Sequence, residues 1–278
     1  MSDGLDRQTE NGTSYLTAGT GSPVVFLHGI PGSSFTWESV ATRMQEQYQV
    51  IVPDLRGFGQ SDPPAGDYYM EGQARAIKEL LGALSVEEFV LVTHDFGGPV
   101  GLTMMRLFPE LDVQELVLSS TNLFSDTDVP LPLRVAKIPL LNTLFFQMMV
   151  GNRVGLRMLY RGAVKQNETV PWSQFQRHLT PSGIRLTRRI FQRSLADLEA
   201  NYGPIEQLLP DLRNGALVLW GDSDPFFSTG VAERIRFAIP DAELILFDET
   251  GHFVPEERSE EVATAIRNYL RAESKPNS

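Results

Sequence analysis

Residues 89–98, FVLVTHDFGG, decide the fold, because an apolar run ends there in the polar pair His94-Asp95, and two glycines follow after Phe96. The run at 89–93 has no polar alternation, which predicts a strand covered on both faces. The residues from 97 to 108 predict a helix. The chain must therefore turn sharply at Asp95, and Gly97 and Gly98 allow the helix to pass close to its neighbours. Taken alone, Asp95 could equally be an ordinary helix cap.

Further runs of the same kind lie on both sides of this stretch and alternate with helical stretches. Such alternation predicts a doubly wound α/β sheet whose strands are mostly parallel. The expected strands are 23–27, 49–53, 89–93, 116–119, 216–220 and 243–247, and the expected helices are 33–47, 73–84, 97–108 and 257–271.

The alternation stops between residues 123 and 213, where no convincing strand occurs. Apolar residues there recur at the spacing of one helix face. An apolar substrate is one interpretation of that face, and helix core is the favoured one. We predict a core domain of residues 1–122 and 214–278 and a helical cap of residues 123–213 over the carboxyl ends of the strands, where ligands bind. The recurring residues are Leu140, Leu141, Leu144, Phe145, Met148 and Met149.

Composition excludes several classes of function. The net charge of −11 disfavours nucleic acid as a partner, and the absence of cysteine excludes disulfides and thiolate chemistry. The histidines lack metal-ligand spacing, so neither a metal nor a cofactor is expected. The polar first residues and the absence of an apolar stretch of about 20 residues predict no signal peptide and no membrane span, hence a cytoplasmic protein. The polar ends, 1–12 and 272–278, are expected to lack regular structure.

Two motifs place chemistry at the ends of predicted strands. Residues 93–97 follow the Gly-x-Ser-x-Gly pattern of a nucleophile elbow, with Thr93 in the first position and Asp95 in the position of the nucleophile. An upstream loop, HGIPG at 28–32, also follows a strand. Taken alone, this stretch fits an ordinary Gly-Pro turn slightly better than a functional loop. Loops of this kind supply one backbone N–H to an oxyanion hole, and the residue after the nucleophile supplies the other. The candidate donors are therefore Ile30 and Phe96.

The remaining members of a triad are expected near the carboxyl end of the chain. The stretch WGDSDPF at 220–226 offers two acids, Asp222 and Asp224, and the loop at 248–253 offers His252 as a base. Folds that carry such triads differ in the order of the three residues along the chain, and one of these folds has the order nucleophile, acid, histidine. The other histidines have structural interpretations: support of a loop at position 28, shaping of the elbow at position 94, and an exposed position for His178.

These segments, together with DLRGFGQSD at 54–62, resemble the α/β-hydrolases of the epoxide hydrolase and haloalkane dehalogenase group. The resemblance implies the α/β-hydrolase fold with an inserted helical cap. It implies that Asp95 is a nucleophile that forms an alkyl ester, that His252 is the base and that Asp224, followed by proline, is the acid. A carboxylate suits displacement at saturated carbon, where it makes a stable ester.

The leaving group distinguishes the expected activities. Dehalogenases of this group usually hold the halide with an indole N–H after the nucleophile, and Phe96 cannot donate. Epoxide hydrolases use cap tyrosines, for which Tyr160 and Tyr202 are possible proton donors. We therefore expect epoxide hydrolysis to a vicinal diol, with haloalkane dehalogenation as the alternative.

The expected partners are a small apolar substrate and water. A receptor without turnover is an alternative of another class, and the sequence does not address the oligomeric state.

Overall fold

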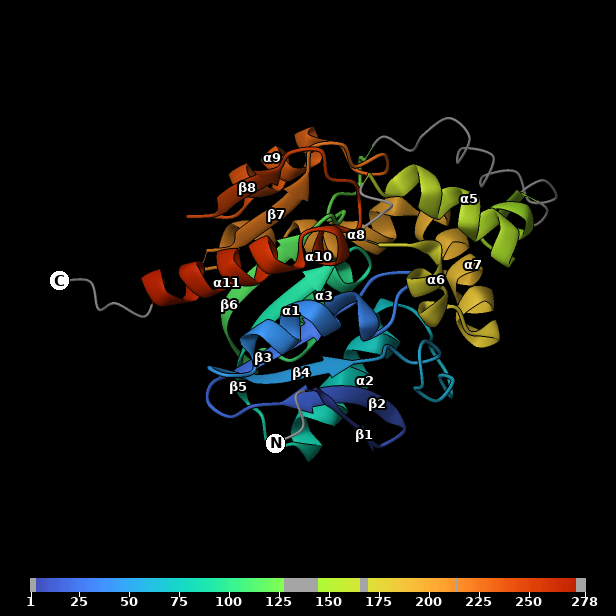
Figure 1. Cartoon of the computed structure of the whole chain (residues 1–278). Coiled ribbons are helices and arrows are strands. Elements are labelled where there is room, and N and C mark those ends of the chain that lie inside the picture. The colour runs from blue at the N-terminus through green and yellow to red at the C-terminus, as the bar shows by residue number, and fades with distance from the viewer. Residues whose placement is uncertain (1–3, 128–144, 166–169, 214, 274–278) are drawn as a thin grey trace.

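The computed structural model describes residues 4–127, 145–165, 170–213 and 215–273. One sheet has the strand order β1-β2-β4-β3-β5-β6-β7-β8, with helices on both faces (Figure 1). Strands β3 to β8 run parallel, and β2 is antiparallel to both β1 and β4. The predicted α/β fold is thus confirmed. The strands are β1 Asp6–Glu10, β2 Thr13–Ala18, β3 Pro23–Leu27, β4 Gln49–Pro53, β5 Glu88–His94, β6 Asp112–Ser119, β7 Leu217–Gly221 and β8 Glu243–Phe247.

Of the residues 1–12 predicted to be irregular, 1–3 lie outside the described residues, and for the rest the prediction was wrong, because Asp6–Glu10 forms the edge strand β1. Its side chains are mostly exposed, so a polar composition hides the strand. Asn11 and Gly12 connect β1 to β2 with φ of 49° and 76°, the conformation of a two-residue hairpin turn. The Asn-Gly pair was therefore the signal that indicated this hairpin.

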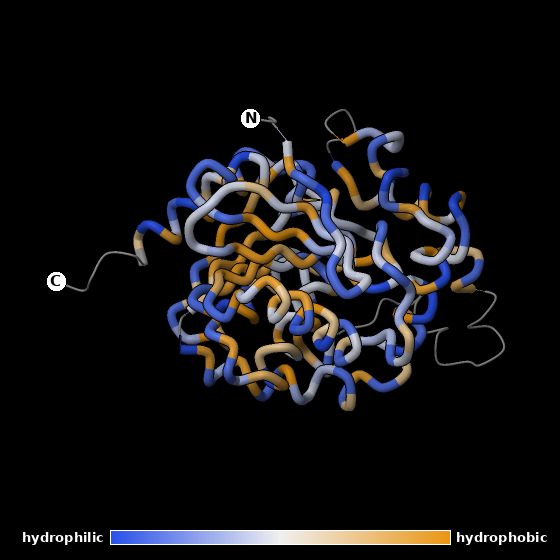
Figure 2. Tube along the Cα trace, turned by 90° about the horizontal axis from the view of Figure 1, so that it is seen from below, coloured by the Kyte–Doolittle hydropathy of each residue, from blue (hydrophilic) through white to orange (hydrophobic). Residues whose placement is uncertain are grey.

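The central parallel strands are largely apolar because they are covered on two faces. Alternate residues point to opposite sides, and in β3 Val25 and Leu27 face one core while Val24 and Phe26 face the other. Figure 2 shows these strands as the most hydrophobic part of the trace. The first core is closed mainly by α2 Met70–Ala83, α3 Gly97–Leu107 and α9 Thr229–Ala238, and the second by α1 Phe35–Met44 and α11 Ser259–Glu273.

Between β6 and β7 the described residues form helices and no strand, beginning with a helical stretch at 145–149. A third apolar core lies within this insert and includes Phe253 from the core domain. Leu140, Leu141 and Leu144 of the predicted apolar face lie outside the described residues. The remaining helices are α5 Arg153–Ala163, α6 Trp172–Phe175, η2 Gln176–His178, α7 Pro181–Ala196, α8 Leu198–Glu206, η3 Leu209–Asp211 and α10 Val254–Glu257. No helix in the described part of the chain could cross a lipid bilayer.

Candidate active site

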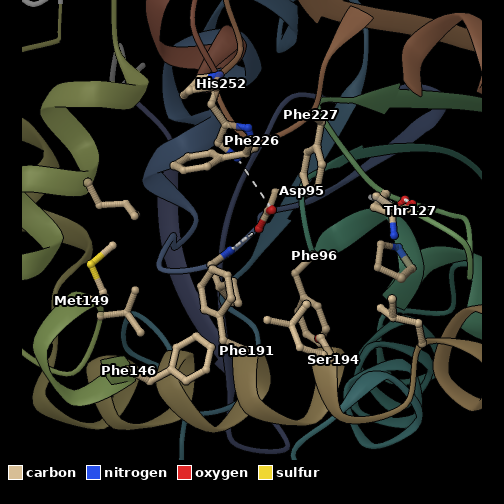
Figure 3. Close-up of a pocket in the computed structure, with 18 of the residues that line it drawn as sticks. Asp95, Phe96, Thr127, Phe146, Met149, Phe191, Ser194, Phe226, Phe227 and His252 are labelled. Atoms are coloured by element: carbon tan, nitrogen blue, oxygen red, sulfur yellow. Dashed lines mark hydrogen bonds and ion pairs between the residues drawn. The ribbon is translucent and has the colours of Figure 1, made fainter. Parts of the chain in front are cut away.

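Asp95 lies at the corner between β5 and α3 with a φ of 50°. Few residues other than glycine adopt this left-handed conformation, and it persists only where the surroundings hold it. The backbone N–H of Asp95 donates to the carbonyl of Ser119 at 3.1 Å, and its carbonyl accepts from the Thr121 hydroxyl at 2.6 Å. These two bonds tie the corner to the end of β6. The side chain of Asp95 therefore points away from the sheet and into a cavity (Figure 3).

Two backbone N–H groups hold the carboxylate of Asp95. Ile30 donates to Oδ1 at 2.7 Å, and Phe96 also hydrogen-bonds this side chain. The close approach requires a glycine, because a Cβ at Gly29 would lie 2.3 Å from both Cβ and Oδ1 of Asp95. The two N–H donors that the sequence predicted thus both contact the carboxylate of Asp95.

His252 lies between two carboxylates that come from different strands. Its Nδ1 is 2.9 Å from Oδ2 of Asp224, and its Nε2 is 3.7 Å from Oδ2 of Asp95. Asp224 is fixed in turn, because its Oδ1 accepts the N–H groups of Phe226 at 2.8 Å and Phe227 at 3.1 Å. This arrangement leaves Nε2 of the imidazole directed at the carboxylate of Asp95.

The structure separates the two acids that the sequence offered. Asp222 is exposed, and its Oδ1 accepts the N–H of Thr250 at 3.3 Å. Asp224 is buried and bonds His252. Asp222 is therefore a loop residue, and Asp224 is the acid that contacts the imidazole.

Burial and charge set the protonation of the three groups. Burial raises the pKa of Asp95, and the charge of His252 and the two N–H groups oppose that shift. Burial lowers the pKa of His252, but the charges of Asp224 and Asp95 outweigh it and the net shift is upward. For Asp224 the effect of burial is outweighed by His252 and the backbone donors, so its pKa is lowered. The neighbouring acids thus stabilise the charged form of the imidazole, while burial disfavours the charged form of Asp95.

The other three histidines are buried and support the site. His28 accepts the N–H of Leu55 on Nε2 at 2.9 Å, and Nε2 of His94 is 3.0 Å from the carbonyl of His252. His178 was expected to be exposed, and this prediction was wrong. It lies 2.8 Å from the Ser33 hydroxyl and 3.5 Å from a carboxylate oxygen of Glu256, so it joins the insert to the core domain.

A cavity of about 320 Å³ opens above Asp95 and His252. Its walls are largely apolar and come from both the core domain and the insert (Figure 3). Tyr202 lines this cavity. Tyr160 is not among the lining residues, and its hydroxyl donates to the carbonyl of Val170. The other lining residues are Ile30, Phe96, Pro99, Asn122, Thr127, Phe146, Met149, Val150, Leu159, Phe191, Ser194, Leu195, Leu198, Pro225, Phe226, Phe227 and Phe253.

Sequence reasoning missed two polar residues that surround Tyr202. The hydroxyl of Tyr69, at the start of α2, lies 2.9 Å from that of Ser194 on α7. Both hydrogen-bond the Tyr202 hydroxyl and lower its pKa, although burial raises that pKa to about 12. The ring of Tyr69 also packs against that of Phe96, with 5.6 Å between centroids. No local pattern marks either residue, because the three hydroxyls come from three separate helices.

Comparison with known proteins agrees with this geometry: a model of the alpha/beta hydrolase fold family matches residues 22–259. The chain belongs to this family. It is 29% identical to the cis-3-alkyl-4-alkyloxetan-2-one decarboxylase of Shewanella oneidensis over 94% of this chain and 85% of the relative. A shorter match, covering 31% of this chain and 30% of the relative, is 41% identical to the soluble epoxide hydrolase of Corynebacterium sp..

A solved structure has the same fold. Epoxide hydrolase CorEH superposes with a TM-score of 0.77 at 21% identity, covering 96% of this chain and 98% of the other. The curated relatives carry out different reactions, so family membership makes this chain an α/β-hydrolase-fold enzyme and leaves its substrate open.

Proposed function

We propose that Asp95 displaces an oxygen leaving group from a saturated carbon of a strained ring, and that the first candidate reaction is hydrolysis of an epoxide to a vicinal diol. The observation that carries this proposal is an aspartate, rather than a serine, at a strained corner beside two N–H donors and His252. A carboxylate attacks saturated carbon to give a stable ester, whereas its product with an ester substrate would be a reactive anhydride.

In the first half-reaction the free oxygen of Asp95 attacks one epoxide carbon, and the carbon–oxygen bond of the ring breaks. The alkoxide that leaves requires a proton, which the Tyr202 hydroxyl supplies. Tyr202 lines the cavity, and its contacts with Tyr69 and Ser194 stabilise the tyrosinate that remains. Tyr160 is less suited to this role, because its hydroxyl is bonded to a backbone carbonyl.

In the second half-reaction His252 takes a proton from water, and the hydroxide attacks the carbonyl carbon of the Asp95 ester. The N–H groups of Ile30 and Phe96 hold the oxyanion. When it collapses, the ester carbon–oxygen bond breaks, and the departing alkoxide takes the proton of the newly formed carboxyl group, which gives the diol and restores the carboxylate of Asp95. The proton on His252 returns to the tyrosinate, so no proton is gained or lost over the cycle. Asp224 orients the imidazole and stabilises its charged form.

Halide displacement is less well supported by the cavity. No tryptophan is among its lining residues, so an indole N–H does not reach the place where a halide would leave. The side-chain amide of Asn122 donates one of its two N–H groups to the carbonyl of Phe124 at 3.0 Å.

A second candidate substrate is a four-membered lactone, an oxetan-2-one. It is favoured by the length of the match to the Shewanella oneidensis decarboxylase, which covers 94% of this chain. Attack of Asp95 on the saturated ring carbon would break its bond to oxygen and free a carboxylate. Loss of CO₂ would then form an alkene from the electrons of the carbon–carbon bond and expel Asp95, without any water being consumed.

Product analysis with a substrate panel tests these proposals. Aryl and alkyl epoxides, oxetan-2-ones and alkyl halides are offered to the full-length protein and to Asp95→Asn. Diol, alkene with CO₂, and halide identify the three reactions. One epoxide turnover in ¹⁸O-labelled water should label Asp95 before the diol, and label in the first diol released would refute the ester intermediate. Thermal stabilisation by a ligand without any product would favour a receptor instead.

A further inference from the structure

The insert carries a charge opposite to that of the rest of the molecule. Residues 123–213 hold 12 of the 24 Lys and Arg but only seven of the 35 Asp and Glu, a net charge of +5. The remainder of the chain therefore has a net charge of −16. An acidic protein with one basic region binds anionic surfaces in one orientation, because only that region is attracted. Described helices of this region contribute to the wall of the cavity.

Helix α5 displays part of this charge in a regular row. Arg153, Arg157 and Arg161 are exposed and spaced four residues apart, so they lie on one side of the helix. Within the described residues, no carboxylate lies within ion-pair distance of these three guanidinium groups. Other arginines of the insert, such as Arg177 and Arg193, pair with acids of the core domain and hold the two parts together.

Exposed apolar side chains lie beside this row. Val154 and Met158 on α5 are 72% and 73% exposed, and Met148 is 65% exposed. The carbonyl of Met148 packs against Gly155, which places Met148 beside the first turn of α5. Cations next to large exposed apolar groups on one helix are typical of helices that lie in a lipid–water interface.

The same segments also form part of the cavity wall. Leu159 on α5 lines the cavity and directly follows Met158, and Met149 and Val150 line it and follow Met148. Helix α5 lies at the outer edge of the molecule, on the side opposite to α11 (Figure 1). The side of α5 with Leu159 thus contacts the apolar cavity, and the side with Val154 and Met158 contacts solvent.

We propose that the α5 face, defined as Met148, Arg153, Val154, Arg157, Met158 and Arg161, docks the enzyme onto an anionic lipid surface. The arginines contact lipid headgroups, while the methionines and the valine enter the boundary with the acyl chains. Docking places the cavity next to a phase in which apolar substrates are concentrated. This inference holds whichever strained ring the enzyme opens.

Co-sedimentation of the full-length protein with vesicles tests the proposal. We expect binding to phosphatidylcholine vesicles that contain about one-third phosphatidylglycerol, although the protein itself is acidic. Binding to pure phosphatidylcholine should be much weaker, and raising the ionic strength from about 0.1 M to about 1 M should abolish most of the binding to anionic vesicles. No binding to anionic vesicles, or equal binding to both kinds, would overturn the proposal.

Matched variants distinguish binding through the α5 face from a general effect of the protein's net charge. The triple variant Arg153→Gln, Arg157→Gln, Arg161→Gln should bind about 100-fold more weakly, from roughly fivefold for each arginine. The control Arg43→Gln, Arg267→Gln, Arg271→Gln removes the same charge from α1 and α11 and should change binding about twofold or less. Equal losses in the two triple variants would show that only net charge matters.

The apolar contribution has its own pair of variants. Met158→Ser should weaken vesicle binding roughly tenfold, whereas Phe237→Ser, at a core-domain residue that is 77% exposed, should not. Thermal unfolding of each variant checks that it folds. Sedimentation velocity without lipid is the last measurement. If the protein is a dimer and Met158→Ser dissociates it, the α5 face binds a second copy of the chain, and lipid docking is refuted.

Discussion

At the scale of single residues, the site is governed by the coupling of Asp95 and His252. The charge of Asp95 helps to raise the pKa of the imidazole. If Asp95 becomes an ester, as proposed, that charge disappears and the pKa of His252 falls. The lower pKa favours the neutral imidazole in the intermediate, and only the neutral form can accept a proton from water. Formation of the ester would thereby prepare the base for the second half-reaction.

Removal of the base should separate the two half-reactions. His252→Gln is expected to let Asp95 react with an epoxide but to slow release of the product by roughly 10²- to 10⁴-fold. Mass spectrometry of the intact protein should then show one added substrate mass on Asp95. The double variant with Asp95→Asn is the control and should show no added mass. An unmodified Asp95 in His252→Gln would contradict the proposed order of steps.

Gly29 gives a second prediction, because it lies against the nucleophile. A methyl group there would overlap the Asp95 carboxylate, and the loop would have to carry the N–H of Ile30 away. Gly29→Ala should therefore lower kcat roughly 10²- to 10³-fold, the usual cost of one lost oxyanion donor. Gly82→Ala is the matched control, since a Cβ at Gly82 meets nothing within 4 Å. Activity that survives in Gly29→Ala would argue against this oxyanion hole.

At the scale of elements, helices α2, α7 and α8 bring three hydroxyl groups together. Tyr69 and Ser194 are 125 residues apart in the chain, yet their hydroxyls lie 2.9 Å from each other. Tyr202 completes the cluster and is the member that both lines the cavity and is affected by the charge of Asp95. The packing of the insert on the core domain thus determines which hydroxyl reaches the substrate.

This cluster predicts a dependence on the leaving group. Tyr202→Phe should slow alkylation of Asp95 by an epoxide roughly 10²- to 10⁴-fold, because the alkoxide needs a proton. Ser194→Ala leaves Tyr202 in place but raises its pKa, so the loss should be smaller, roughly tenfold. An alkyl bromide needs no proton, and its single-turnover rate should be unchanged in both variants. Equal losses with both substrates would indicate a purely structural role.

At the scale of the whole molecule, two buried histidines make stability depend on pH. Burial lowers the pKa of His28 from 6.5 to about 4 and that of His94 to about 3. Both imidazoles stay largely neutral in the folded protein from about pH 6 to about pH 4, whereas in the unfolded chain each of the two takes up a proton over this range. Stability therefore falls as the pH falls from about 6 to about 4. His252 contributes little in this range, since its raised pKa leaves it protonated in both states.

Urea unfolding between pH 7 and pH 4 measures this effect. The two histidines should together lower the free energy of unfolding by about 2.7 kcal/mol per pH unit near pH 5. His94→Asn should remove about half of that slope, because one of the two protons is no longer taken up. A slope that is the same in the variant and the wild type would show that carboxylates alone cause the acid sensitivity.

Local patterns predicted the layers of this molecule. The apolar runs of the parallel strands are covered on both faces, and their carboxyl ends meet at one edge, so the segments with Asp95, Asp224 and His252 were expected near one another. The hairpin of β1 and β2 was missed, because an exposed edge strand needs no apolar face. A mainly helical insert was expected because no strand pattern occurs there, but its individual helices and their contacts with the rest of the chain were not.

The sequence by itself determined the α/β fold, because strand and helix periodicities are properties of neighbouring residues. Only the tertiary structure buried His178 against Ser33 and Glu256, placed Tyr202 rather than Tyr160 at the cavity, and joined Tyr202 to Tyr69 and Ser194. The physical reason is that these contacts join helices distant in the chain. Their energy depends on how the insert packs, and no local pattern of residues encodes that packing.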